Sequence, residues 1–576
     1  MPPELRVSIG QHSDKGRKQT NQDFHGALVP AQPALGLKGI AIALADGISS
    51  SAVGGIASES AVKSFLADYY CTSESWSVKT SAQRVIVATN SWLHAQTRRS
   101  GCAYDRDKGY VCTLTVMVVK SATAHIFHVG DARIYRVCGS ALEQLTDDHR
   151  VVVSAEQSYL GRALGADGRI EIDYHAVPIE TGDVFVMMSD GVYEHVDAAF
   201  VTRAIDMHGG CLDRAADAIA CEAYDQGSPD NLTVQIVRID AVPAGEADEV
   251  LGSASSLPLP PLLDARMTFD GYRILRQIHA SSRSHIYLAV DADSGETVVL
   301  KIPSMDLRGD VAYLRRFMME EWIARRIDNA HVLKPRPPSR RRNYLYVVTE
   351  YVEGRTLAQW MIDNPRPDLE TVRTIVEQIA RGLRAFHRME MLHQDLRPQN
   401  VMIDTAGTVR IIDFGAARVA GVREASPSVD NGAILGTAQY TAPEYFLGDD
   451  GSPRADLFSL GVIAYQMLTG QLPYGTQVAQ ARTRAQQRRL AYRPARAINP
   501  GVPAWVDGAL EKAVRTDPYR RYEELSEFTF DLRHPREAFL RTSPLPLMER
   551  HPLLFWKGLS LVLACAVLLL LAAPIR

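Results

Sequence analysis

Four short motifs in the first 240 residues place an aspartate where an apolar run breaks into a turn. They are TNQDF with Asp23, ALADGIS with Asp46, VMMSDGVY with Asp190 and GSPDNLTV with Asp230. Carboxylates gathered at strand ends form a hard oxygen site suited to Mg²⁺ or Mn²⁺. Two such ions can hold water as a nucleophile and clamp a phosphate, so the set predicts a hydrolase. A single Asp-Gly pair is more often simple turn chemistry, so the prediction depends on all four motifs together.

The elements that must position these aspartates are predominantly strands. Runs such as HIFHVGDARIYRV and GDVFVMMSDGVY alternate as half-buried strands do. Residues 61–70 and 81–96 have helical spacing and are expected to flank the sheets. Residues 241–264 are rich in Pro, Gly, Ser and acids, which indicates a linker. Beyond it, a strand-rich segment to about residue 350 gives way to long helical patterns, which predicts a small β lobe followed by a larger α lobe.

The composition is that of an ordinary globular protein. The 576 residues are 46% hydrophobic and 23% charged, so two or three folded domains are expected. The net charge of −4 gives no electrostatic reason to expect nucleic-acid binding. Seven scattered cysteines without a CxxC pair fit buried thiols in a reducing compartment, so a cytoplasmic location is predicted for the folded domains.

The C-terminal residues 553–575 are almost wholly apolar, with Lys557 as their single charge. About 20 residues cross a hydrocarbon core, so this segment predicts one transmembrane helix. Basic residues on its N-terminal flank favour cytoplasmic domains anchored to the inner membrane. The alternative is a C-terminal helix buried against the last domain.

Residues 5–240 resemble the metal-dependent Ser/Thr protein phosphatase family along nearly their whole length. GRKQTNQD, ADGI, GYVCTLTV, HVGDARIYRV, LEQLTDDH, SDG and SPDN occur in the family's order. The resemblance implies an αββα β-sandwich with two or three Mn²⁺ or Mg²⁺ ions. The implied ligands are Asp46, Gly47, Asp190, Asp230 and, for a third ion, Asp131. Asp46 would bridge two ions, and Asp23 would orient the attacking water.

Two positions depart from this family's pattern. Gln22 stands where an acid usually precedes Asp23, and Lys18, with Arg17 beside it, stands where a phosphate-binding arginine is usual. A lysine attracts phosphate as a point charge but cannot form the two-pronged fork of an arginine. An active phosphatase with reduced affinity is therefore expected. The alternative is a domain that only binds phosphoproteins.

The stretch from Gly271 to about His534 resembles the eukaryotic-like Ser/Thr protein kinases. LKIP, RRFMMEEW, VVTEYVEG, HQDLRPQN, IIDFGAAR, GTAQYTAPE and DPYRRY occur in the family's order. The resemblance implies a bilobal kinase fold that uses ATP with Mg²⁺. The implied residues are Lys301 at the ATP phosphates, Glu320 or next Glu321 as its partner, Glu350 to Val352 under adenine, Asp395 as base or orienter, Arg397 near the transferred phosphate, and Asn400 and Asp413 as Mg²⁺ ligands. Arg521 is expected to pair with Glu444.

The stretch IHASSRSHIYLAVD stands where kinases carry a glycine-rich loop over the ATP phosphates. Its glycine positions are His279, Ser281 and Ser284. Side chains there stiffen the loop, but serine hydroxyls are donors and keep the two serines as candidate nucleotide contacts. Gln394 replaces the catalytic-loop arginine that docks a phosphorylated activation segment, so activity independent of such phosphorylation is expected. Thr437 and the Ser426 to Ser428 region are candidate autophosphorylation sites.

The combined prediction is a multidomain α+β chain. Residues 1–240 form the phosphatase domain, 241–267 the linker, 268–540 the kinase domain and 553–575 the transmembrane helix. The predicted function is reversible phosphorylation of a bacterial regulatory target, a phosphoprotein substrate, or of the chain itself, with no nucleic-acid partner. The alternative keeps the phosphatase active and makes the other half a nucleotide-binding pseudokinase that regulates it.

Overall fold

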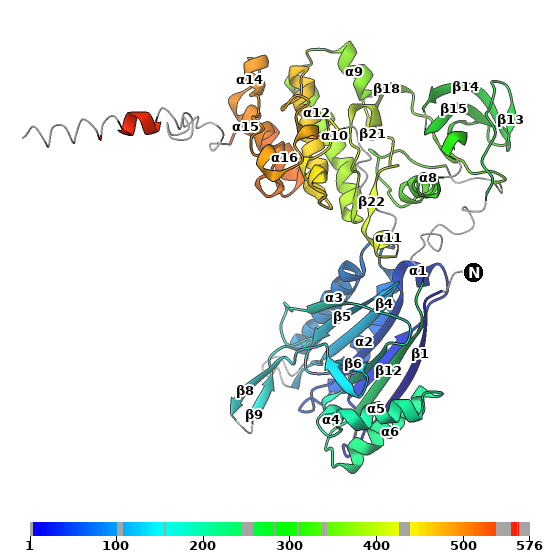
Figure 1. The fold of residues 1–576 in the computed structure, drawn as a ribbon, viewed down its shortest axis with the longest axis vertical. Coiled ribbons are helices and arrows are strands. Elements are labelled where there is room, and N and C mark those ends of the chain that lie inside the picture. Colours follow the sequence, from blue (N-terminus) through cyan, green and yellow to red (C-terminus); the bar gives the residue numbers. More distant parts are fainter. Residues whose placement is uncertain are drawn as a thin grey trace, which may run out of the picture. The chain divides into compact units, whose positions relative to one another are not determined.

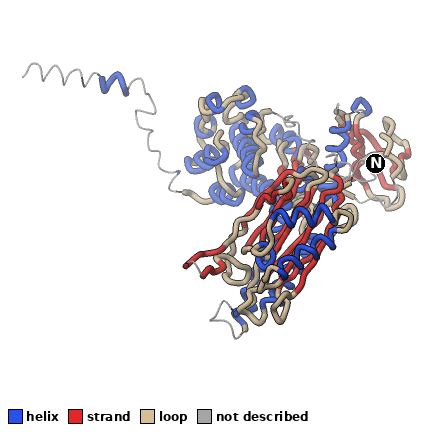
Figure 2. The backbone as a smooth tube through the Cα atoms, turned by 60° about the horizontal axis from the view of Figure 1, so that its bottom comes forward, coloured by secondary structure: helices blue, strands red, loops and turns tan. Residues whose placement is uncertain are grey.

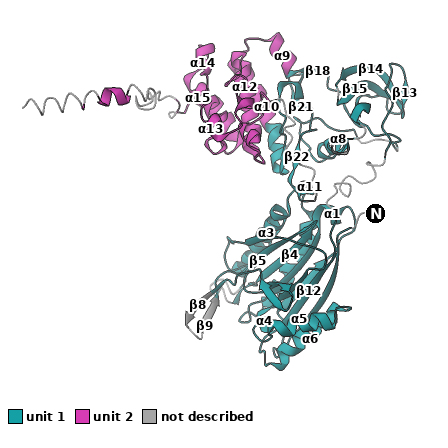
Figure 3. Cartoon of the chain, viewed as in Figure 1, with its two compact units in different colours: residues 1–357, 381–436 teal, residues 358–380, 437–576 magenta. Residues whose placement is uncertain are grey.

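The computed structural model describes residues 4–100, 108–154, 157–243, 257–281, 283–307, 310–336, 340, 342–425, 438–536, 539, 555–560 and 563 (Figure 1). The chain divides into two compact units, residues 1–357 with 381–436 and residues 358–380 with 437–576 (Figure 3). Residues 244–256 of the predicted linker lie outside the described residues.

The first 243 residues form two five-stranded sheets whose neighbouring strands all run antiparallel. One sheet has the order β1 (Arg6–Asp14), β12 (Leu232–Ala241), β11 (Val184–Met188), β6 (Arg133–Cys138) and β7 (Ala141–Gln144), and the other β10 (Asp173–Pro178), β5 (Thr123–Val129), β4 (Leu114–Lys120), β3 (Ile40–Asp46) and β2 (Asp23–Leu28). Helices flank the strands, as Figure 2 shows.

Strand β3 explains the layering, because every residue from Ile40 to Ala45 is fully buried. Side chains alternate across a strand, so its isoleucines and Leu44 face the opposite sheet while its alanines face helices. The alanines pack with α2 (Gly54–Cys71) and α3 (Val78–Arg99), and the larger residues pack with Phe185 and Val237 of the other sheet.

Helices α5 (Ala198–Met207) and α6 (Leu212–Asp225) cover the outer face of the other sheet. The order of layers is therefore helix, sheet, sheet, helix, as predicted. Short elements complete this part of the chain: α1 (Ala34–Lys38), α4 (Asp190–Tyr193), and the separate two-stranded sheet of β8 (Arg150–Ser154) and β9 (Gln157–Leu160).

From residue 268 the chain forms a third five-stranded sheet with one long helix. Its strands are β13 (Thr268–Phe269), β14 (Tyr272–Ala280), β15 (Ser284–Asp291), β16 (Thr297–Pro303) and β17 (Val347–Glu350), and the helix is α8 (Val311–Ala324). Short strands follow: β18 (Gly354–Thr356), β19 (Met391–Leu392), β20 (Val401–Asp404), β21 (Val409–Ile411) and β22 (Arg418–Val419), with α11 (Ala420–Ala425).

The second unit is helical in its described part. Its helices, some continuing from the first unit, are α9 (Leu357–Asp363), α10 (Leu369–Arg388), α12 (Pro453–Thr469), α13 (Arg484–Gln487), α14 (Ala495–Ile498), α15 (Ala504–Ala513) and α16 (Leu525–Arg533). Arg521 forms the predicted pair with Glu444, each terminal guanidinium nitrogen 2.7 Å from a carboxylate oxygen, and both side chains are buried.

The prediction of a transmembrane helix over residues 553–575 is wrong, and so is the membrane anchorage inferred from it. None of the helices in the described ranges has both the length and the apolar character needed to cross a bilayer. Within that segment the structure describes residues 555–560 and 563 alone. Apolar composition predicted a span, but a span also needs about 20 continuous helical residues.

Candidate active sites

The ends of five strands carry the predicted metal-binding aspartates and Asp23 in the first domain. Asp23 opens β2 directly opposite Asp46, the last residue of β3. Asp190 follows β11, Asp230 precedes β12, and Asp131 follows β5. The site is therefore assembled from both sheets, at one end of the sandwich.

Asp23 is the most enclosed of these acids. Its Oδ2 accepts hydrogen bonds from Ser189 Oγ at 2.9 Å and Thr233 Oγ1 at 2.7 Å. Its Oδ1 is buried and receives no hydrogen bond within the described residues. An orphaned carboxylate oxygen in a buried site is a position that a bound cation would satisfy.

Burial and mutual repulsion raise the pKa values of these acids. Burial is the main cause for Asp23. The pKa of Asp46 is raised well above its usual range by burial and then by the charges of Asp23 and Asp190. For Asp190, burial and then Asp131 raise the pKa to about 7. Acids crowded in this way are stabilised by a proton or by a nearby cation.

The donor set fits hard divalent cations, since it consists of carboxylate oxygens with one carbonyl. Within the described residues, however, no three His, Cys, Asp or Glu side chains converge as a ready metal site. Basic side chains already hold oxygens of three acids: Lys18 at Asp230 and Arg150 at Asp131 and Asp190.

Lys18 and Arg17 have different environments, although they are adjacent. Lys18 Nζ lies 3.1 Å from Asp230 Oδ1 and donates to Ser49 Oγ at 2.9 Å, so it faces the acids. Arg17 instead donates to the carbonyls of Gly227 and Tyr224 and lies over the Tyr224 ring. Of the two predicted phosphate-binding residues, only Lys18 therefore points into the site.

Gly47 lies in a position that excludes any side chain. A Cβ there would come within 2.4 Å of the Gly54 backbone. Gln22, the expected departure from the family's acid, donates from Nε2 to the Ser51 carbonyl at 2.7 Å. The side-chain amide of Gln22 thus stabilises the loop that contains Ser51.

Arg150 is the site residue that sequence reasoning missed. Its guanidinium contacts Asp131 at 2.6 Å, Asp190 at 2.8 Å and Glu194 at 2.7 Å. The available signal was its position directly after TDDH, between two motifs whose aspartates were already implicated.

The second candidate site centres on Lys301 in β16. Its Nζ lies 2.6 and 2.9 Å from the two carboxylate oxygens of Glu320 and 3.4 Å from Asp413. Burial alone would lower the pKa of Lys301, but Asp413 and Glu320 outweigh it and raise the pKa, so the lysine is protonated. Glu321, the second choice from sequence, pairs with Arg342 instead.

The catalytic-loop residues form a compact network. Asn400 Nδ2 donates to the Asp395 carbonyl at 2.9 Å and to its carboxylate at 3.1 Å, and Arg397 Nε lies 3.5 Å from that carboxylate. Asp413 Oδ1 accepts from the Gly415 amide at 3.0 Å. Burial would raise the pKa of Asp413, but Lys301, the Gly415 amide and other neighbours together hold the pKa below its usual range. Gln394 has φ +63°, a left-handed conformation unusual for a residue with a side chain.

The Ser281 hydroxyl forms hydrogen bonds within the serine-substituted loop. Ser281 Oγ accepts from the Ser284 amide at 3.1 Å and donates to the Ser284 carbonyl at 3.1 Å. The Arg283 carbonyl accepts hydrogen bonds from the Ser304 amide and the Tyr313 hydroxyl. The two candidate serines therefore close a turn in this structure.

The positions predicted to lie under adenine are at the end of strand β17 and directly after it. Glu350 ends β17 and accepts from the Lys334 amide at 3.1 Å, and Val352 is buried two residues later. The candidate autophosphorylation residues Thr437 and Ser426 to Ser428 lie outside the described residues.

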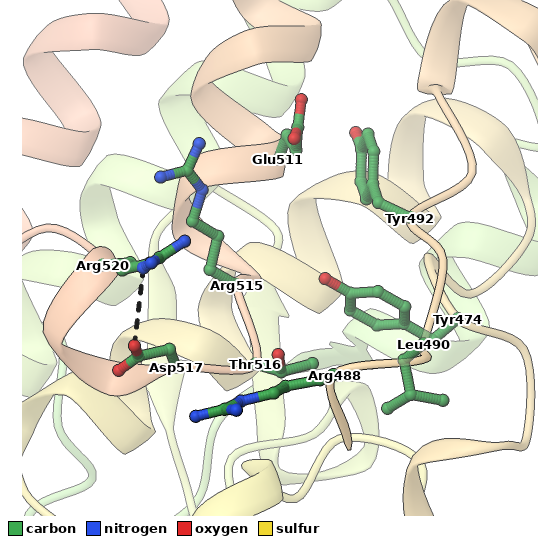
Figure 4. A pocket seen from close by; sticks show the side chains of 9 residues that line it. All are labelled: Tyr474, Arg488, Leu490, Tyr492, Glu511, Arg515, Thr516, Asp517 and Arg520. Carbon is green, nitrogen blue, oxygen red and sulfur yellow. Dashed lines mark ion pairs between the residues drawn. The ribbon is translucent and has the colours of Figure 1, made fainter. Parts of the chain in front are cut away.

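A cavity of about 700 Å³ lies in the second unit, and none of these residues lines it (Figure 4). Its lining residues are Tyr474, Arg488, Leu490, Tyr492, Glu511, Arg515, Thr516, Asp517 and Arg520. Its arginines do not converge on one point and are mixed with two acids. It therefore offers no defined charge for a ligand and none of the predicted chemistry.

Family comparisons match both halves of the chain. Residues 11–218 match the protein phosphatase 2C model, and residues 272–527 match the protein kinase domain model. The solved structure of PppA from Pseudomonas aeruginosa, described as a key regulatory component of T6SS, is 20% identical with a TM-score of 0.35. It covers 41% of this chain and 99% of its own.

The curated relatives are bacterial kinases. The serine/threonine-protein kinase PrkC of Bacillus subtilis is 29% identical over 275 residues, 46% of this chain and 41% of PrkC. The chain thus spans less than half the length of the first relatives it matches. PknL of Mycobacterium tuberculosis is 30% identical over 286 residues, 50% of this chain and 68% of PknL. The chain belongs to the serine/threonine-protein kinases, and a protein phosphatase 2C domain precedes its kinase domain.

Proposed function

We propose that this chain is a bifunctional enzyme that phosphorylates and dephosphorylates serine or threonine residues of a protein target. The observation that supports the proposal is the co-occurrence of two clusters of charged residues. One is a cluster of buried acids with an orphaned oxygen, and the other is the Lys301–Glu320 ion pair beside Asp413. Domain limits near 1–240 and 268–540 accompany this proposal.

In the phosphatase half, Asp46, the Gly47 carbonyl, Asp190, Asp230 and Asp131 would hold two or three Mn²⁺ or Mg²⁺ ions. Such ions supply a water nucleophile at neutral pH and neutralise the phosphate charge. Asp23, fixed by Ser189 and Thr233, would orient that water and take its proton. Lys18 would attract the substrate phosphate as a point charge.

In the kinase half, Lys301 would hold the ATP phosphates, because Glu320 fixes its ammonium group. Asp395 would accept a hydrogen bond from the substrate hydroxyl, with Arg397 near the transferred group. Asn400 and Asp413 would hold Mg²⁺, which neutralises charge developing on the phosphates. Glu350 and Val352 would lie under the adenine.

The deciding experiment is phosphate transfer from labelled ATP by the full-length chain carrying Asp190→Asn, which prevents erasure of the product. We expect label on protein and its loss when Asp413→Asn is added. We also expect the unaltered chain to hydrolyse a small aryl phosphate at the acid cluster of the phosphatase half, and we expect this hydrolysis to depend on Mn²⁺. Absence of both activities in folded protein would refute the proposal.

A second candidate function is an active phosphatase regulated by a nucleotide-binding pseudokinase. The closed Ser281 turn favours it, because its hydroxyl is already committed within the loop. The Asp395→Asn variant separates the two functions. If ATP changes the phosphatase rate of this variant, and if the Asp190→Asn protein takes up no label from ATP, the second domain senses nucleotide without transferring phosphate.

A further inference from the structure

Arg150 is the first residue of β8, on a two-stranded sheet separate from the sandwich. From there its guanidinium reaches three acids: Nε binds Asp131 Oδ2 at 2.6 Å, one terminal nitrogen binds Asp190 Oδ2 at 2.8 Å and the other binds Glu194 Oε1 at 2.7 Å. Each of the three guanidinium nitrogens thus donates a hydrogen bond to a different acid.

Two of these three acids belong to the proposed metal ligands. A divalent ion binds a carboxylate oxygen at about 2.0 to 2.6 Å through the lone pairs that these hydrogen bonds occupy. The guanidinium is also permanently charged, so it repels an approaching ion. Arg150 and a metal ion therefore compete for the same oxygens.

The surroundings explain why these acids attract a cationic side chain. Asp131 is buried, and Asp23, Asp46 and Asp190 repel one another within the same enclosed site. A guanidinium bound to two acids neutralises part of this charge. It thus stabilises the metal-free fold at the acids where a third ion would bind.

We propose that Arg150 is an internal counter-cation that occupies Asp131 and Asp190 in the metal-free enzyme and withdraws when a divalent ion binds there. This inference rests on the proposed function, since it uses the assignment of these acids as metal ligands. Metal binding is then coupled to the position of the β8–β9 sheet. The arginine weakens binding of the ion at Asp131 while protecting the empty site.

The test is titration calorimetry of the full-length chain with Mn²⁺, comparing the unaltered protein with Arg150→Ala and Arg150→Gln. We expect the weakest detected site to bind Mn²⁺ about tenfold more tightly in both variants. The matched control is Arg136→Ala, because Arg136 pairs with Asp183 at 2.7 Å on the same sandwich without contacting the proposed ligands.

Thermal unfolding supplies a second readout that does not depend on activity. Without metal, Arg150→Gln is expected to unfold at a lower temperature than the unaltered chain. Saturating Mn²⁺ is expected to raise its unfolding temperature by more than it raises that of the unaltered chain. The unfolding temperature of Arg150→Lys, whose ammonium group reaches one acid at a time, should lie between those of Arg150→Gln and the unaltered chain.

The outcomes separate this inference from the proposed function. If Asp190→Asn leaves all Mn²⁺ binding unchanged, the metal-site assignment fails, and the proposal for Arg150 fails with it. If Asp190→Asn weakens binding while both Arg150 variants match the control within twofold, the counter-cation role alone is refuted. Raised KM for an aryl phosphate with unchanged Mn²⁺ affinity would identify Arg150 as a substrate contact instead.

Discussion

At the scale of single residues, the adjacent side chains of Arg17 and Lys18 have different partners. Lys18 faces Asp230 and Ser49, whereas Arg17 is fixed by the Gly227 and Tyr224 carbonyls. The basic side chain that faces the acids is therefore a lysine, although an arginine lies next to it in the chain. A point charge attracts phosphate but does not fix its orientation.

Replacing Lys18 by arginine is expected to tighten phosphate binding, because a guanidinium can donate two parallel hydrogen bonds. We predict a KM for an aryl phosphate that is lower by about threefold to tenfold, with kcat changed by less than twofold. Steady-state kinetics at saturating Mn²⁺ measures both constants. Arg17→Lys is the matched control and should leave KM unchanged; a fall in KM there would contradict this assignment.

Motifs predicted much of the site at this scale, because chemistry restricts residue type at fixed spacing. The pairing of Lys301 with Glu320 followed from such a motif, and the structure resolves the choice against Glu321. Arg150 could not be predicted in the same way. Its contacts join positions 131, 150, 190 and 194, and only the folded backbone brings these positions together.

At the scale of elements, strand β5 combines a structural and a titrating role. His125 and His128 are both buried on it, the first 3.0 Å from the Tyr174 hydroxyl and the second 2.9 Å from Thr115 Oγ1. Burial lowers the pKa of each to about 4, assisted by Lys120 for His125 and by His149 for His128. Both rings are neutral in the folded protein at neutral pH.

This strand should make the sandwich sensitive to acid. The unfolded chain binds protons at His125 and His128 near pH 6.5, while the folded chain binds them near pH 4. Stability is therefore lost as pH falls between these values, by up to about 3 kcal/mol per histidine. Urea unfolding at pH 7.0 and 4.5 measures the loss. The double variant His125→Gln, His128→Gln should lose less, and an equal loss would contradict this origin.

Periodicity predicted the two helical ranges that flank the sheets, because it records burial, whereas the order of the layers was implied by the resemblance to the phosphatase family. Helices α2 and α3 include the predicted helical ranges 61–70 and 81–96. The prediction at residues 553–575 was wrong: it rested on apolar composition alone, and no helix in the described ranges is long and apolar enough to span a bilayer. The closed turn at Ser281 was also beyond sequence reasoning, since loss of glycine does not reveal where the hydroxyl hydrogen-bonds.

At the scale of the whole molecule, the two opposed activities proposed for one chain would make removal of phosphate independent of an encounter between molecules. A tether of about 24 residues between the proposed domains keeps each at high effective concentration for the other. If label on the kinase half is removed by the phosphatase of the same chain, its decay is first order in protein.

We predict that the half-life of the label changes by less than twofold when the labelled full-length protein is diluted tenfold. The measurement adds Mn²⁺ to protein labelled without it and follows decay at two concentrations. Mixing labelled Asp190→Asn protein with unlabelled chain supplies the control, because only removal between molecules can occur. A half-life that lengthens tenfold on dilution would show that removal occurs between chains.

The pairing of β1 with β12 also has a consequence for the order of events during synthesis. β1 ends at Asp14, but its partner β12 begins at Leu232, about 220 residues later. At about 5 to 20 residues per second, a ribosome needs roughly 10 to 40 s to reach that strand. The first strand of the nascent chain must wait unpaired for this interval, so the phosphatase sandwich closes only as translation enters the kinase region.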